Sequence, residues 1–113
     1  MPRHHSDELA GRWPSFSLGR QLMMIANEIN RAGNWIIKGD PDEARLCYER
    51  ALELMMFTIG GVRRHGQLRE LCRAKMVIQK FWLETPSREM NAQFSNTLIA
   101  LSPESWAMLH PAE

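Results

Sequence analysis

Residues 26–56 have the sequence ANEINRAGNWIIKGDPDEARLCYERALELMM, which predicts two helices joined by a tight turn. Gly39 should end the first helix, because glycine adopts the left-handed conformation without steric cost. Asp40 then offers a side-chain oxygen to the free amides of the second helix, and Pro41 suits its first turn. A connection this short forces the two helices to run antiparallel.

Apolar residues recur at spacings of three and four on both sides of this hairpin, which predicts four long helices. We expect them over residues 17–38, 41–60, 67–84 and 86–101, the last one capped by Thr85. Gly33 interrupts the first helix at a cost of about 1 kcal/mol relative to alanine. It indicates either the close approach of a neighbouring helix or simple tolerance. No alternating apolar pattern is long enough to predict a strand.

The two ends of the chain differ from the helical part. Residues 1–12 are polar, and we expect a flexible tail followed by a single domain over residues 13–113. Trp13 and Phe16 flank a proline, and two aromatic rings are costly to leave in water. This segment should therefore pack across the bundle as an extended arm.

A final short helical turn should begin at residues 102–104, docked by Trp106 and Leu109. The predicted fold class is therefore all-α. Its architecture is a four-helix antiparallel bundle with an extended N-terminal arm and a short C-terminal helical turn.

Composition limits the class of protein. A chain of 113 residues with 44% hydrophobic and 24% charged residues is typical of one globular domain. A net charge of +1 argues against a surface that is wholly a nucleic-acid or membrane ligand. There is no signal-peptide pattern and no apolar run near about 18 residues, so we expect a cytoplasmic protein. Cys47 and Cys72 lack metal-type spacing, and we expect both to be thiols in the core. A single disulfide between them is the alternative.

Small and aromatic residues in the hairpin resemble one tetratricopeptide unit. The matching positions are Ala32, Trp35, Gly39, Asp40, Ala44, Tyr48, Ala51, Leu52 and Leu54. The resemblance covers a single unit of about 34 residues, with Met56 where the family has proline and no second copy downstream. It implies a protein-binding scaffold without catalytic residues. Convergence on good hairpin packing is the alternative explanation.

The segment 63–80 is basic, with six cations against one acid. Its candidate nucleic-acid contacts are Arg63, Arg64, Arg69, Arg73 and Lys80. The alternative is that this face is solvated, or that it pairs with the acids of the second helix. Those acids are Asp42, Glu43, Glu49 and Glu53.

The chain carries a large apolar load of four Trp, four Phe and eight Met. We expect part of it to remain exposed as a surface for a protein partner or for a second copy in a homodimer. The expected partner-binding residues are Met55, Met56, Phe57, Trp82 and Phe94. The alternative is that all of them belong to the core.

Signals for catalysis are missing from the sequence. It has no glycine-rich phosphate loop, no paired-histidine metal motif and no Gly-x-Ser-x-Gly turn. We expect His4 and His5 to be a loose pair, and Glu49 and Glu53 to lie on a solvent face. The expected function is therefore a helical interaction or adaptor module that self-associates as a homodimer, with no enzyme activity, cofactor or metal. The alternative is a nucleic-acid-binding accessory protein that uses segment 63–80.

Overall fold

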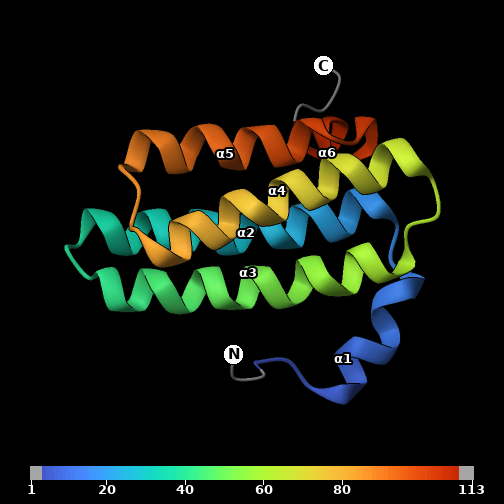
Figure 1. The fold of residues 1–113 in the computed structure, drawn as a ribbon, viewed down its shortest axis with the longest axis horizontal. Coiled ribbons are helices and arrows are strands. Elements are labelled where there is room, and N and C mark those ends of the chain that lie inside the picture. Colours follow the sequence, from blue (N-terminus) through green and yellow to red (C-terminus); the bar gives the residue numbers. More distant parts are fainter. Residues whose placement is uncertain (1–3, 110–113) are drawn as a thin grey trace.

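The structure, a computed structural model, describes residues 4–109 apart from the side chains of Trp106, Met108 and Leu109. The elements, in order (Figure 1), are α1 (Asp7–Arg12), η1 (Trp13–Ser15), α2 (Leu18–Ile37), α3 (Pro41–Gly61), α4 (His65–Leu83), α5 (Arg88–Ala100) and α6 (Pro103–Leu109). No strand occurs among the described residues, which confirms the all-α class. The predicted docking of Trp106 and Leu109 concerns side chains outside this description.

The turn between α2 and α3 has the chemistry that its sequence predicts. Gly39 has a φ of 77°, in the left-handed region. The Oδ1 atom of Asp40 accepts a hydrogen bond from the backbone N–H of Glu43 at 3.1 Å, which caps α3. Helices α2 and α3 lie side by side and run in opposite directions (Figure 1).

Packing between the long helices is uneven. Helix α2 packs along both α3 and α5, and α3 also packs along α4. The backbones of α4 and α5 lie farther apart, and the ring of Phe81 on α4 meets the ring of Phe94 on α5 at a centroid distance of 5.5 Å. In Figure 1, α4 lies obliquely across the other long helices. The described molecule has a radius of gyration of 13.6 Å, close to the roughly 13 Å expected for a compact chain of this length.

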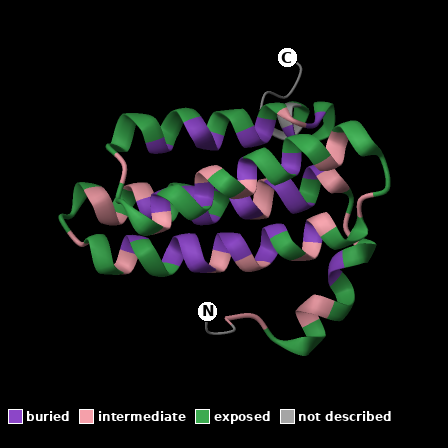
Figure 2. Ribbon diagram, viewed as in Figure 1, coloured by how far each residue is buried: buried purple, intermediate pink, exposed green. Residues whose placement is uncertain are grey.

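The core lies where the apolar stripes of the helices meet (Figure 2). Its fully or almost fully buried aliphatic and aromatic members include Leu22, Ile25, Ile29, Tyr48, Met55, Leu71, Ile78, Phe81, Phe94 and Leu98. Burying such a side chain contributes about 1.5–3 kcal/mol. Met90, near the start of α5, is 50% exposed and lies outside this core.

Two helix starts differ from their expected positions. Helix α5 begins after Ser87, whose hydroxyl accepts from the backbone N–H of Met90 at 3.2 Å, so the predicted cap at Thr85 is wrong. Pro86 fixes the chain before it in an extended conformation and delays the helix by two residues. Helix α4 begins at His65 without a side-chain cap, two residues earlier than expected.

Residues 4–12 are not a loose tail in this structure. Ser6 caps α1, whose acidic first turn suits the positive end of the helix dipole. The predicted extended arm is instead a 3₁₀ turn at Trp13–Ser15. Trp13 is only 1% exposed and donates from Nε1 to the Thr58 hydroxyl at 3.0 Å. The buried amide of Gln21 donates to the carbonyl oxygens of Trp13 and Phe16, which holds the turn against α2.

Candidate functional site

A groove of about 420 Å³ lies between α4 and α5. Its apolar lining residues are Ala74 and Val77 of α4 with Phe94 and Leu101 of α5, and its polar ones are Glu70, Arg73 and Thr97. Burying apolar surface contributes about 25 cal/mol of free energy for each Å² that a neighbour covers. The groove is therefore a place where another chain gains free energy by docking.

The outer side of α4 continues this apolar surface. Positions 69, 73, 76, 80 and 83 follow each other at spacings of three or four, so they share one side of the helix. Met76 is 66% exposed and Leu83 is 71% exposed. Arg69, Arg73 and Lys80, also exposed, lie among them. We call this set of five residues together with the groove the α4–α5 face.

The basic segment faces solvent. Arg63 and Arg64 are exposed at the start of α4, like the three cations of the α4–α5 face. Within residues 4–109, no side chain of segment 63–80 forms an ion pair with the acids of α3. The pairing alternative is therefore wrong, because Glu49 and Glu53 are turned toward the N-terminal histidines instead.

The five residues expected to bind a partner do not form one surface. Met55 is fully buried and Phe94 is 8% exposed, so both are corrected to core positions. Phe57 is half-buried, with its ring centroid 6.2 Å from that of Trp13. Trp82 is half-buried beneath the guanidinium of Arg45, 4.6 Å from the ring centroid.

Only Met56 of that set is openly exposed, at 54%. Phe94 agrees with the prediction in one respect, because its small exposed part lines the α4–α5 groove. The sequence could not assign these positions, since which side of a uniformly apolar helix end is covered depends on elements far along the chain.

A cluster that the sequence analysis missed joins His4 and His5 to α3. The Glu53 carboxylate accepts the backbone N–H groups of His4 and His5 at 2.9 and 2.8 Å, and lies 2.9 Å from the His5 ring Nδ1. Burial alone would raise the pKa of Glu53, but these donors and the His5 ring lower its pKa overall. His4 Nε2 lies 3.9 Å from the Glu49 carboxylate, which is buried rather than on a solvent face. No set of three or more His, Cys, Asp and Glu within the described residues could hold a metal ion.

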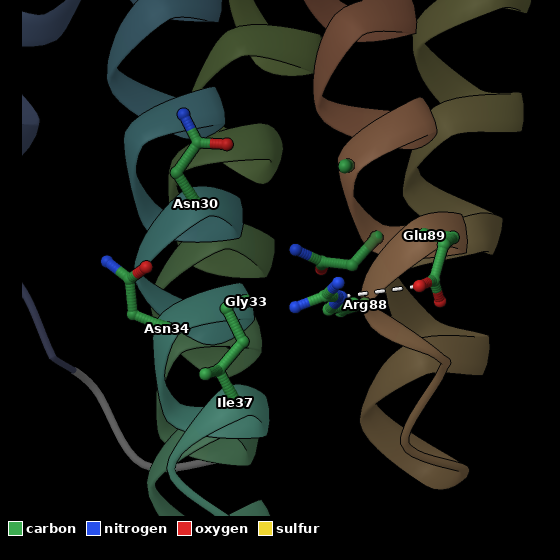
Figure 3. Close-up of a pocket in the computed structure, with 8 residues that line it drawn as sticks. Asn30, Gly33, Asn34, Ile37, Arg88 and Glu89 are labelled. Carbon is green, nitrogen blue, oxygen red and sulfur yellow. Dashed lines mark hydrogen bonds and ion pairs between the residues drawn. The ribbon is translucent and has the colours of Figure 1, made fainter.

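A second groove, of about 460 Å³, separates α2 from the start of α5. Figure 3 shows Asn30 and Asn34 on α2 across this groove from Arg88 and Glu89 on α5. Arg88 donates to the neighbouring Glu89 at 3.3 Å, and both side chains are largely exposed. The lining offers hydrogen-bonding groups but no nucleophile beside a base, so it presents no catalytic arrangement.

The floor of that groove is structural. Asn91, 2% exposed, donates from Nδ2 to the Ile29 carbonyl at 2.9 Å and accepts from the Tyr48 hydroxyl at 2.6 Å. Burial raises the pKa of Tyr48, so its hydroxyl remains a donor. A Cβ atom at Gly33 would lie 2.8 Å from Asn91 Nδ2, which confirms the close approach indicated by this glycine.

The remaining ionic and thiol groups are also structural in character. Glu28, 7% exposed, accepts from Arg50 of α3 at 2.9 Å and from Arg31 at 2.8 Å, although its sequence position falls outside the apolar stripe. Burial raises the pKa of the Cys47 thiol, with Arg50 opposing the shift. Cys72 is exposed, so its assignment to the core is wrong, and both cysteines are free.

Comparison with protein-family models, with curated proteins and with solved structures found no match to this chain. Within the described residues, every helix is too short or too polar to cross a bilayer.

Proposed function

We propose that the chain is a non-catalytic protein-interaction module. In this proposal α2, α3, α4 and α5 form a four-helix antiparallel bundle that is open between α4 and α5, and a helix of a partner protein completes it. One observation carries the proposal: α4 lines an apolar groove with α5 and also carries two exposed apolar side chains, Met76 and Leu83. Exposed apolar surface that is contiguous and rimmed by polar residues is characteristic of interaction sites.

The magnitudes support docking at this face. Covering Met76 and Leu83 would contribute about 1.5–3 kcal/mol each, before the cost of ordering the partner. The tetratricopeptide-like hairpin implies the same class of function. Neither groove in the described part of the chain places a nucleophile next to a base, which favours binding over chemistry.

Nucleic-acid binding through Arg63, Arg64, Arg69, Arg73 and Lys80 is the second candidate. It is favoured by their exposure and by the lack of ion pairs to α3. It ranks below protein binding because Met76 and Leu83 lie among these cations and would gain nothing from phosphate. A gel-shift assay with an oligonucleotide tests it: retention that weakens with salt and with Arg69→Ala and Arg73→Ala would favour it.

Self-association through this face is less favourable than docking of a different protein. A two-fold contact pairs the same surface of both copies, and this surface has three cations and one acid, so it offers Arg69, Arg73 and Lys80 few opposite charges. Light scattering of the purified chain should therefore give the monomer mass. A dimer mass that falls to monomer on Val77→Glu substitution would instead make a second copy the occupant.

Site-specific photo-crosslinking in the producing cells tests the proposed function. A photoreactive side chain in place of Thr97, on the rim of the groove, should form covalent adducts with a partner protein. The same group in place of exposed Leu46 on α3 is the matched control and should form none. Val77→Glu, with folding checked by circular dichroism, should abolish the adducts at position 97. Adducts of equal yield at both positions, or none at position 97, would contradict the proposal.

A further inference from the structure

The geometry points to an acidic amphipathic helix as the element that occupies the α4–α5 face. This inference rests on the proposed function and specifies the chemistry of the partner. It depends on three features of the face: its shape, its apolar floor and the charge of its two rims.

The shape suits a rod. Two helices wall the groove, and α5, with 13 residues, is about 20 Å long. A helix laid between them would present side chains at spacings of three, four and seven toward the floor, the usual mode of helix-in-groove recognition. The floor residues Ala74, Val77, Phe94 and Leu101 are all apolar, so the inserted stripe must be apolar too.

The charge of the rims is asymmetric. On the α4–α5 face, helix α4 carries Arg69, Arg73 and Lys80, and the acid Glu70 also lines the groove. Thr97, the exposed residue of α5 that lines the groove, is uncharged. One flank of the docked helix therefore meets cations and the other meets neutral groups. Acids on the first flank would be attracted, while lysines there would be repelled.

The basic segment is also unusual within this chain. Segment 63–80 has six cations and one acid, whereas the whole chain has 14 cations and 13 acids, so the rest of the chain is net acidic. None of the cations on the α4–α5 face is neutralised by an ion pair within residues 4–109. Their charge remains available to a partner.

A helix fits this face better than the other acidic ligands. A phosphate backbone would use Arg69, Arg73 and Lys80 but would leave Met76, Leu83 and the groove floor in water. A lipid surface is flat on this scale and would cover the exposed apolar residues without filling the groove. An acidic amphipathic helix satisfies the cations and the concave apolar surface together.

Three synthetic helices test the inference against the full chain. Each has about 18 residues with leucines at spacings of three and four, and the flanking positions are all Glu, all Gln or all Lys. Fluorescence anisotropy should show the Glu-flanked helix binding about tenfold or more tightly than the Lys-flanked helix, because three weak attractions at the exposed rim become three repulsions. The preference should shrink as salt rises, because these charges are exposed.

Two variants locate the effect. Reversing the rim with Arg69→Glu, Arg73→Glu and Lys80→Glu should shift the preference to the Lys-flanked helix, since these exposed positions carry no core contacts. Val77→Glu should weaken all three helices. Leu46→Glu on α3 changes an exposed apolar residue away from this face, so it is the control and should leave the affinities unchanged.

Equal affinity of the three helices would overturn the inference on charge. Failure of all three to bind would overturn it as well, and the crosslinking at position 97 would still decide the proposed function separately. Tighter binding of a single-stranded oligonucleotide, or of phosphatidylserine vesicles, that survives Val77→Glu would also overturn it.

Discussion

At the scale of single residues, Asn91 sets the distance between α2 and α5. Its side chain bonds a backbone carbonyl of one neighbouring helix and a hydroxyl of another, and both bonds are buried. A buried amide without hydrogen-bond partners costs about 1–3 kcal/mol, so the two partners fix the position of the Asn91 side chain. Gly33 provides the space that Asn91 occupies.

The sign of the change in unfolding free energy caused by Gly33→Ala therefore tests this contact. Helix propensity alone would stabilise the variant by about 1 kcal/mol. The added Cβ would lie 2.8 Å from an amide held by two hydrogen bonds, and such overpacking costs about 1–3 kcal/mol. Urea unfolding should show net destabilisation. Gly60→Ala is the matched control, because it lies in α3 with no heavy atom within 4 Å, and should stabilise by about 0.5 kcal/mol. A stabilised Gly33→Ala variant would contradict the role given to Asn91.

The sequence could indicate Gly33 as one side of this contact, but it could not indicate Asn91 as the other. A glycine inside a strongly periodic helix stands out, so the close approach at Gly33 was predictable. The partner was not, because Asn91 lies 43 residues from Tyr48 and 62 residues from Ile29. A polar residue on an otherwise apolar helix face is ambiguous until its hydrogen-bond partners are known.

At the scale of elements, the N-terminal segment over residues 4–16 acts as a strap on α3. It is held at one end by Glu53 and at the other by the contact of Trp13 with Thr58. Helix α1 between them buries no residue. The stability of the strap therefore depends on its two attachment points.

Protonation should loosen the first attachment. Because the pKa of Glu53 is lowered by folding from its ordinary value of 4.5, its contribution is fully present above pH 4.5 and is lost as pH falls through the folded value. Glu53→Gln keeps one acceptor and should cost about 1–2 kcal/mol near neutral pH, a difference that shrinks below pH 4.5.

Urea unfolding at several pH values, read against the exposed Glu8→Gln control, measures this effect. A Glu53→Gln deficit that persists unchanged at pH 3 would show that the carboxylate charge does not hold the strap.

The helices themselves were largely predictable, and the strap was not. Helical periodicity, the glycine stop at Gly39 and the cap at Asp40 are local signals within a few residues. The strap depends on bonds between residues 45 to 49 positions apart, and no local pattern distinguishes its polar residues from those of a loose tail.

At the scale of the whole molecule, the proposed function depends on the groove between α4 and α5. The sequence indicated the basic segment, because charge can be counted along the chain. It could not indicate the groove, which depends on how α4 and α5 are placed relative to each other. Met55 and Phe94 were assigned to the surface for the same reason, because burial is decided by how helices meet.

Amide chemical-shift mapping of the isotope-labelled full chain, titrated with the Glu-flanked helix, tests the central claim most directly. We expect the perturbed amides to cluster on α4 between residues 69 and 83 and on α5 between residues 94 and 101. Perturbations centred on α2 and α3 or on the N-terminal strap, with α4 and α5 unaffected, would contradict the assignment of the open α4–α5 face as the docking site.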